Sequence, residues 1–347
     1  MNKLPLKIPS ATTLIGIACV VGVALWANGD RYQRTLVYLG AMYALLAMAL
    51  YVPYILAGAV SMAFAAYLSI GGLSVGLVAE NTGWPLLAAV PIGVVISMVL
   101  AIGLGLLTHR LTGFHLAAVT LLFALAFVTW HQESSITKGA GGLSILRTAH
   151  LGSIRLTDDA LVVFTLLIVA LTAIGIDRLR RSPIGPALGA RKEAPAAAEA
   201  CGYSTKVLLL VALAAGAAIA SVAGSLFTIS NGAVTSGTFS THIVFLAIFM
   251  PILGGSRSAW GAVLGASIVV YLTFELKLLE DGGTFGFLLT VLAILIVAPK
   301  GLLGLMDKMA AMVRSRLAQW RGSSHEEPVA VPTDRLALDP LPVGDDR

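Results

Sequence analysis

Charged side chains are scarce in this sequence. They make up 12% of the 347 residues, whereas hydrophobic residues make up 57% and the mean hydropathy is +0.89. Soluble globular domains are about 25% charged and about 45–50% apolar, so this composition excludes an ordinary soluble protein. Charge-poor runs of about 20 residues, the length that a transmembrane helix needs, recur from Thr12 to Ala298. The sequence therefore predicts an all-α, polytopic membrane protein.

Cysteine is nearly absent as well. The two cysteines, Cys19 and Cys201, lie far apart in the chain, which excludes a disulfide framework and gives no metal-ligand spacing. We therefore predict no metal site, and we expect both cysteines to be packing residues in or near membrane segments.

Motifs for catalysis and for energy conversion are also missing. No lysine follows a glycine, so the phosphate-binding pattern G-x-x-x-x-G-K-[ST] is absent, and H-E-x-x-H does not occur. Residues 207–256 contain no Asp, Glu, Lys or Arg, so no obvious group in them binds a coupling ion. We predict no catalytic residue and no cofactor on this chain. Energy for transport then comes from another chain, or none is used.

Ten membrane spans are predicted from the hydrophobic runs, and the basic residues orient them. With the N-terminus in the cytoplasm, 17 of the 23 lysines and arginines lie on the inner side of the membrane. The positive-inside rule therefore places both termini in the cytoplasm. The six basic residues left outside are Arg31, Arg34, Lys138, Arg147, Arg155 and Lys277. The predicted spans are 11–27, 35–57, 59–79, 86–108, 114–130, 160–176, 207–229, 242–256, 259–279 and 284–298.

The spans divide the chain into a membrane domain and short flanking segments. Residues 1–10 are a cytoplasmic N-terminus, and 11–300 form the membrane domain with a cytoplasmic loop at 177–206. Residues 301–322 are basic; they fit either an amphipathic helix along the membrane surface or a solvated end. Residues 323–347 are rich in proline and acid and are predicted to be disordered.

Small residues recur at helical spacing in "LAAGAAIASVAGSLF", residues 213–227. Spacings of three and four residues place Gly216 and Gly224 on one helix face, which favours close packing against another helix. The alternative is an uncharged path through the bundle, lined by the hydroxyl groups of Ser221 and Ser225.

Five stretches, in order along the chain, resemble one known family. The most specific is "GGSRSAWGAVLGA" (254–266), in which Gly254, Gly255, Gly261 and Gly265 allow tight turns and close helix approach. The family is that of the permease subunits of ATP-binding-cassette importers for branched-chain amino acids, with urea and amide importer permeases as close relatives. The other four stretches are "FHLAAVTLLFA" (114–124), "TKGAGGLS" (137–144), "RSPIGPALGARKEAPAAAEACGYS" (181–204) and "APKGLLGL" (298–305).

The resemblance implies a role for the 177–206 loop as the coupling loop that docks on an ATPase subunit. Glu199, Ala200 and Gly202 match the docking motif, and Gly202 follows the predicted helix, where glycine can adopt a left-handed conformation. The flanking contacts are Arg191, Lys192 and Glu193. This chain departs from the family at Pro186, Gly189, Ala194 and Pro195, and Pro195 fits the first turn of a helix.

The resemblance also implies partners and a location. These are ATPase subunits that bind ATP and Mg²⁺, a second related permease, an external solute-binding protein and the lipid bilayer of a bacterial inner (plasma) membrane. No nucleic acid is expected.

The segment "GAVSMAFAAY" (58–67) is similar to a family segment on the solute path, and it keeps Gly58 and Ser61. Ser61 and Thr120 are predicted path residues; interhelical hydrogen bonding is the alternative. Where the family commonly has polar residues or glycine, this chain has Ala59, Ala63 and Phe64, so a path here is more apolar.

The sequence thus favours a permease subunit of an importer that moves branched-chain or related amino acids, or urea-like and amide-like solutes. A self-sufficient channel or facilitator is the first alternative, and it would leave the 177–206 loop without a role. A membrane enzyme is the second, and it lacks a reactive group of residues.

Overall fold

The computed structural model describes residues 31–82, 84–111, 113–145, 150–151, 154–155, 158–256 and 258–274. The chain divides into two compact units, Met1–Leu305 and Met306–Arg347, and every described residue belongs to the first. The predicted spans 11–27 and 284–298, the basic segment 301–322 and the tail 323–347 lie outside the described residues.

The described part is almost entirely helical. Two short antiparallel strand pairs, β1 with β4 and β2 with β3, are the additions that the sequence did not predict. The helices are α2 (Arg31–Leu50), η1 (Tyr51–Leu56), α3 (Phe64–Asn81), η2 (Leu86–Ala88), α4 (Ala89–Thr108), α5 (Phe114–Glu133), η3 (Ser135–Thr137), η4 (Gly139–Gly141), α6 (Asp158–Arg181), α7 (Ile184–Glu193), α8 (Pro195–Ala200), α9 (Thr205–Asn231), α10 (Thr241–Gly254) and α11 (Ala259–Phe274). The strands are β1 (Leu143–Ser144), β2 (His150–Leu151), β3 (Ile154–Arg155) and β4 (Ala233–Val234).

Within the described residues, five helical stretches are long and apolar enough to cross a membrane. A membrane core about 30 Å thick needs about 20 helical residues, since each adds about 1.5 Å. The all-α membrane bundle is therefore confirmed, whereas the number of ten spans stays a prediction. The five stretches are Tyr32–Leu56, Leu86–Thr108, Phe114–Glu133, Asp159–Arg181 and Thr205–Asn231, and α10 and α11 are shorter apolar helices.

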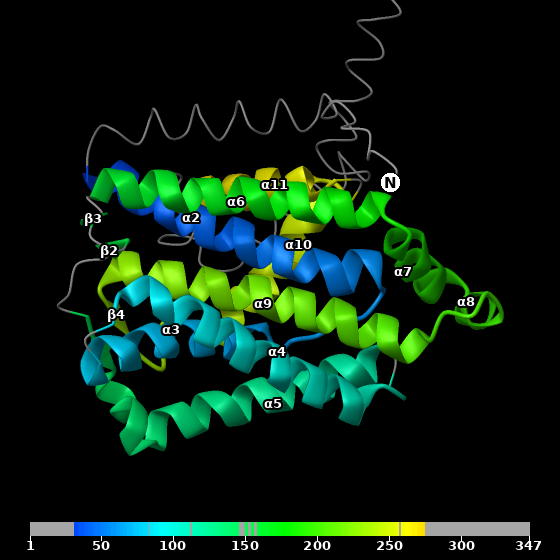
Figure 1. The fold of residues 1–347 in the computed structure, drawn as a ribbon, viewed down its shortest axis with the longest axis horizontal. Helices are drawn as coiled ribbons and strands as arrows, with labels where there is room; N and C mark the ends of the chain where they lie inside the picture. The colour runs from blue at the N-terminus through cyan, green and yellow to red at the C-terminus, as the bar shows by residue number, and fades with distance from the viewer. Residues whose placement is uncertain are drawn as a thin grey trace, which may run out of the picture. The chain divides into compact units, whose positions relative to one another are not determined.

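Helix α9 lies in the middle of the bundle and packs against α2, α3 and α4 (Figure 1). The core includes the fully buried Leu45, Leu46 and Met48 of α2. Helices α4 and α5 keep large apolar side chains exposed, as at Val99 and Leu122. Such an apolar surface fits helices at the edge of a bundle inside a membrane.

Two helix ends differ from the ends of the predicted spans, next to the predicted coupling loop and the predicted path. Helix α3 begins at Phe64 rather than at residue 59, because Gly58 has a φ of 67° and interrupts the helix. Helix α6 continues to Arg181, so the predicted loop 177–206 begins inside a helix. Apolar composition sets the length of a hydrophobic run, but it does not show where the backbone leaves the helix.

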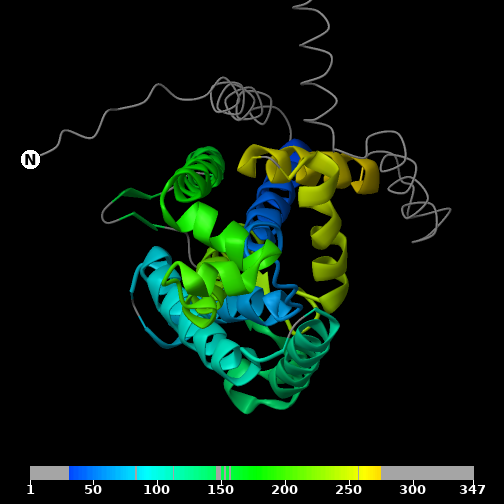
Figure 2. The ribbon, with the colours of Figure 1, turned by 90° about the vertical axis from the view of Figure 1, so that its right-hand side faces the viewer.

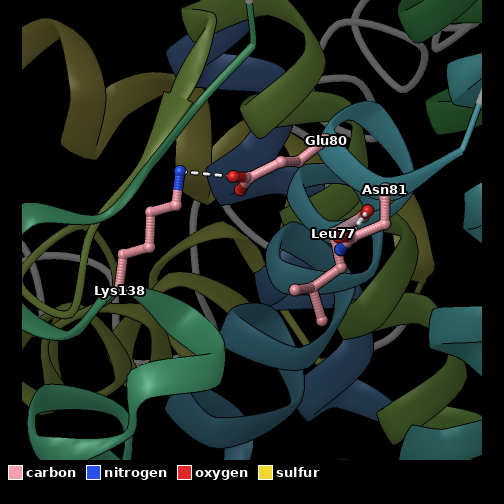
Figure 3. A network of polar contacts seen from close by, with 4 residues as sticks. All are labelled: Leu77, Glu80, Asn81 and Lys138. Atoms are coloured by element: carbon pink, nitrogen blue, oxygen red, sulfur yellow. Dashed lines mark hydrogen bonds and ion pairs between the residues drawn. The ribbon is translucent and has the colours of Figure 1, made fainter.

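The two ends of the helix bundle carry different connecting segments. Helices α7 and α8 lie at one end, and the strands β2 and β3 lie at the other (Figure 1). At the strand end, Arg34 pairs with Asp159 at 2.9 Å, and Lys138 pairs with Glu80 at the end of α3 (Figure 3). The predicted external and cytoplasmic loops therefore lie at opposite ends of the described helices.

A cysteine-labelling experiment checks the orientation. Lys138→Cys and Lys192→Cys, each in a background with Cys19→Ser and Cys201→Ser, should react differently with an impermeant thiol reagent in intact cells. Position 138 should be labelled, and position 192 only after the membrane is permeabilised. Native Cys201 is exposed and serves as a matched cytoplasmic control when it is restored. Equal labelling of both positions in intact cells would contradict the predicted orientation.

Candidate functional site

The chain leaves helical geometry between α2 and α3. Pro53 has no N–H to donate to the preceding turn, and the helix widens into the π-helical segment η1, where Ala57 N–H donates to Val52 O at 3.3 Å. Ala59 N–H then donates to Pro53 O at 2.8 Å. The stretch 57–63, which we call the helix break, follows η1 and precedes α3. Irregular backbone at membrane depth occurs only where protein or a water-filled cavity surrounds it.

The predicted path residues Gly58, Ser61 and Thr120 come together at this break. Ser61 is 2% exposed and its hydroxyl oxygen accepts a bond from Ala63 N–H at 3.4 Å. The Thr120 hydroxyl oxygen on α5 accepts from Met62 N–H at 2.9 Å. Both hydroxyl oxygens thus accept bonds from backbone N–H groups that would bond to carbonyl oxygens in a regular helix. The structure places them at one irregular segment, while their contact with a solute stays a prediction.

The two other predicted path residues, Ser221 and Ser225, lie in a different place on α9. Ser225 Oγ donates to Gly71 O on α3 at 3.0 Å. Ser221 Oγ has no hydrogen-bond partner among the described residues and lies close to Gly93 of α4. These serines therefore occupy the packed contact of α3, α4 and α9. Two further buried hydroxyl groups without a partner in the described part, on Ser97 and Thr228, were missed from the sequence.

The predicted coupling loop forms two short helices, α7 and α8, rather than one. The backbone turns at Ala194, with φ −147° and ψ 75°, between α7 and α8. Pro195 occupies the first turn of α8, as the sequence analysis expects. Pro186 and Gly189, the other departures from the family pattern, lie within α7. Figure 2 looks onto the end of the bundle that carries this helix pair.

The exit of α8 has a left-handed glycine. Gly202 has a φ of 83°, and its N–H donates to Glu199 O at 2.9 Å, while Tyr203 N–H donates to Ala198 O at 3.0 Å. This pair of bonds is the Schellman motif, which satisfies carbonyl groups at the end of a helix. The Thr205 hydroxyl donates to Glu199 Oε1 at 2.6 Å, so Glu199 also ties α8 to the start of α9.

The basic residues of the loop face the bundle. Arg191 Nε donates to Thr205 O at 3.1 Å, and Arg191 Nη1 donates to Ala57 O in the helix break. Lys192 Nζ donates to Ile55 O at 3.3 Å. Burial lowers the pKa of the Arg191 guanidinium, which nonetheless stays charged in proteins. The sequence analysis assigned both residues to ATPase contact, and the structure shows each bonded to this chain.

Other loop residues face away from the bundle. Glu193 and Ala200 are exposed, and so is Cys201, which the sequence analysis expected to be packed. The packing expectation for Cys201 is therefore wrong, because α8 lies at the edge of the molecule and buries little besides Ala198. The exposed side of α8 is free to contact another protein.

The glycine motif lies where α10 and α11 approach each other. A Cβ on Gly254 would lie 1.7 Å from Gly261 O, and one on Gly265 would lie 1.9 Å from Met250 O. Gly255, between the helices, has a φ of 117°. Gly254 and Gly265 therefore lie at a backbone-to-backbone contact that leaves no room for a side chain, and Gly255 serves the tight turn.

A buried carboxylate beside this turn was missed from the sequence. Asp177 on α6 is 8% exposed and accepts bonds from Ala259 N–H at 3.4 Å and from the Ser258 hydroxyl at 3.5 Å. A carboxylate at the start of α11 is favoured by the partial positive charge of a helix N-terminus. The Tyr51 hydroxyl donates to Ser256 O in the same turn at 2.8 Å. The local sequence around Asp177 gives no indication that it contacts Ser258 and Ala259, which are distant in the chain.

A buried histidine was also missed. His131 at the end of α5 is 1% exposed, and neither ring nitrogen has a hydrogen-bond partner among the described residues. The Thr137 hydroxyl donates to the carbonyl oxygen of His131 at 2.8 Å, which closes the turn after α5. The sequence shows only a polar cluster at a membrane edge there.

The similarity to known proteins covers most of the chain. Residues 32–297 match the family described as "Branched-chain amino acid transport system / permease component". The high-affinity branched-chain amino acid transport system permease protein LivM of Escherichia coli K12 is 28% identical over 292 residues, 76% of this chain and 68% of the relative. LivM of Salmonella typhimurium LT2 is 27% identical over 314 residues, 82% of this chain and 73% of the relative. No solved structure matches the chain significantly. The chain therefore belongs to the family of branched-chain amino acid transport permease components, and it is a multi-pass membrane protein.

Proposed function

We propose that this chain is the membrane-spanning permease subunit of an ATP-binding-cassette importer in a bacterial inner membrane. It moves branched-chain or related amino acids, or urea-like and amide-like small polar solutes, into the cytoplasm. The observation that carries the proposal is the α7–α8 pair, which exposes the docking motif on one side and bonds to η1 and the helix break on the other. The family match makes branched-chain amino acids the first cargo to test.

The proposal assigns energy conversion to other chains. ATP and Mg²⁺ bind to separate ATPase subunits, and a second related permease and an external solute-binding protein complete the importer. The exposed apolar faces of α4 and α5 suit lipid or a second permease. A short helix pair on the cytoplasmic face is a rigid element through which closure of an ATPase dimer can move the attached helices.

The surroundings of the helix break bear on the cargo. Ala59, Ala63 and Phe64 are buried there, and so are Ser61 and Thr120, which carry hydroxyl groups. If these residues line the path, the path is more apolar than is common in the family, which favours a cargo other than the standard branched-chain amino acids. Ligand screening of the cognate solute-binding protein identifies that cargo directly.

Two substitutions test the docking motif. Gly202→Val should strain the exit of α8, because a β-branched residue enters the left-handed conformation only at a cost of about 1–2 kcal/mol. Glu199→Lys should reverse a charge on the exposed motif and remove the acceptor for Thr205. Both variants should reach the membrane in normal amounts but lose ATPase binding and solute-stimulated ATP hydrolysis in the reconstituted complex.

Matched controls separate docking from local structure. Glu199→Gln keeps an acceptor for Thr205 but removes the charge, and Gly189→Ala replaces a glycine of α7 that has open space around it. Glu133→Lys makes the same charge change at the opposite end of the bundle. The chain purified alone should neither bind nor hydrolyse ATP. Uptake at the parental rate by both loop variants, or uptake without any ATPase, would favour a self-sufficient channel instead.

A further inference from the structure

The helix break is held by bonds to distant segments, one shortly before it and one near its end. Before the break, the Tyr51 hydroxyl donates to Ser256 O in the α10–α11 turn at 2.8 Å. Near the end of the break, Met62 N–H donates to Thr120 Oγ1 on α5 at 2.9 Å. The backbone between Tyr51 and Met62 is therefore held on both sides by hydrogen bonds to other parts of the chain.

The carbonyl groups between those attachments are held by α7. The last carbonyl groups of a helix have no N–H donor within that helix and need one from elsewhere. Here Ala57 O accepts from Arg191 and Ile55 O accepts from Lys192. A cation suits this position, because the C-terminal end of a helix carries partial negative charge. The same α7 side chains leave no room at Gly58, where a Cβ would lie 2.7 Å from Lys192 Cγ.

Arg191 joins more segments than Lys192 does. Its guanidinium donates from Nη1 to Ala57 O and from Nε to Thr205 O, the first residue of α9. A guanidinium has several donors in a fixed planar fork, whereas a lysine ammonium is a single point charge on a flexible chain. One side chain of α7 thus contacts both the helix break and the start of the central helix.

We propose that Arg191 is a positioning residue for transport that transmits movement of the α7–α8 pair to the helix break at 57–63. The inference rests on the proposed importer function. When an ATPase moves α8, α7 moves with it, and the Arg191 bond carries that movement to Ala57 and so to the backbone beside Ser61. Arg191 then acts between the docking surface and the path, rather than as a contact to the ATPase.

Uptake per ATP hydrolysed is the measurement that tests this role. In proteoliposomes with the complete importer, Arg191→Ala should bind the ATPase and hydrolyse ATP as the parent does, but uptake per ATP should fall about tenfold, within the usual range for a coupling between sites. Arg191→Lys should restore part of the loss, because lysine supplies the charge but not the fork. Arg110→Ala, at the exposed connection between α4 and α5, is the control and should behave as the parent.

A second measurement needs no ATPase. Ser61→Cys, in the background with Cys19→Ser and Cys201→Ser, reports access to the helix break through its rate of reaction with a small thiol reagent. Adding Arg191→Ala should raise that rate, since Ala57 loses its bond to α7. The Arg110→Ala control should leave it unchanged.

The outcomes separate the inference from the importer proposal. An unchanged labelling rate together with unchanged uptake per ATP in Arg191→Ala would overturn the role of Arg191 and leave the importer intact. Loss of ATPase binding in Arg191→Ala would also overturn it, because Arg191 would then act at the docking surface. Failure of the parental complex to couple uptake to ATP would instead overturn the proposed function.

Discussion

Gly224→Ala should sharply lower the amount of folded protein and the midpoint of its thermal unfolding in detergent. A Cβ on Gly224 of α9 would lie 2.0 Å from Leu68 O and 2.9 Å from Leu68 Cα, both backbone atoms of α3. The contact is reciprocal, because a Cβ on Gly71 would lie 2.0 Å from Ser221 O. No side chain can rotate to make room, so α3 and α9 must separate. Overpacking of this kind costs about 1–3 kcal/mol, and occasionally more.

Gly103→Ala is the matched control for this prediction. Gly103 also lies within a helix, α4, but no atom lies within 4 Å of the position that its Cβ would occupy. Alanine inside a helix is favoured over glycine by about 0.5–1 kcal/mol, so this variant should be as stable as the parent or slightly more stable. The two substitutions add the same methyl group, but only Gly224→Ala should lower the unfolding midpoint. Equal midpoints would mean that α3 and α9 do not touch through their backbones.

The long helices could be predicted from local composition. The runs 86–108 and 114–130 correspond closely to η2 with α4 and to α5, because each is largely apolar, contains no Asp, Glu, Lys or Arg, and is bounded by polar or turn-forming residues. The small residues at Gly216 and Gly224 likewise lie at the contacts of α9 with α2 and α3. These features depend on residues that are close together in the sequence. The family resemblance adds the order in which the helices and motifs follow one another.

The helix break could not be predicted in this way. Residues 35–79 are one nearly continuous apolar run, and Pro53 alone does not fix where a helix ends. The break depends on partners that distant parts of the chain supply: Arg191 donates to Ala57 O, and the Thr120 hydroxyl oxygen accepts from Met62 N–H. Tertiary contacts therefore decide the local structure there.

The sequence analysis did not predict that the Arg191 side chain points toward the helix bundle, and the reason is related. The family resemblance identifies the motif of the coupling loop, but it does not show which side of α7 packs on the bundle. The buried Ala187 and Leu188 set that side, and they place Arg191 beside the helix break rather than in solvent. The same packing leaves Cys201 exposed at the outer edge.

Gly265→Ala is the second substitution with a large expected effect. A Cβ at this position of α11 would lie 1.9 Å from Met250 O and 3.0 Å from Gly254 N, both backbone atoms of α10. The helices are joined by the short turn at Gly255, so α11 cannot move away without disturbing the bond from Tyr51 to Ser256 O. We expect a loss of stability of about 1–3 kcal/mol or more, since added volume in a packed contact is destabilising.

The control for Gly265→Ala is Gly175→Ala on α6, where no atom lies within 4 Å of the added Cβ position and stability should be kept. Thermal unfolding in detergent and the yield of monodisperse protein measure the difference between the two variants. Gly254 and Gly265 contact backbone atoms of the opposite helix, so the loss should appear in the yield of folded protein more than in uptake per folded molecule. A Gly265→Ala variant that folds as well as Gly175→Ala but transports no solute would contradict this assignment, and it would move the motif from helix packing to the solute path.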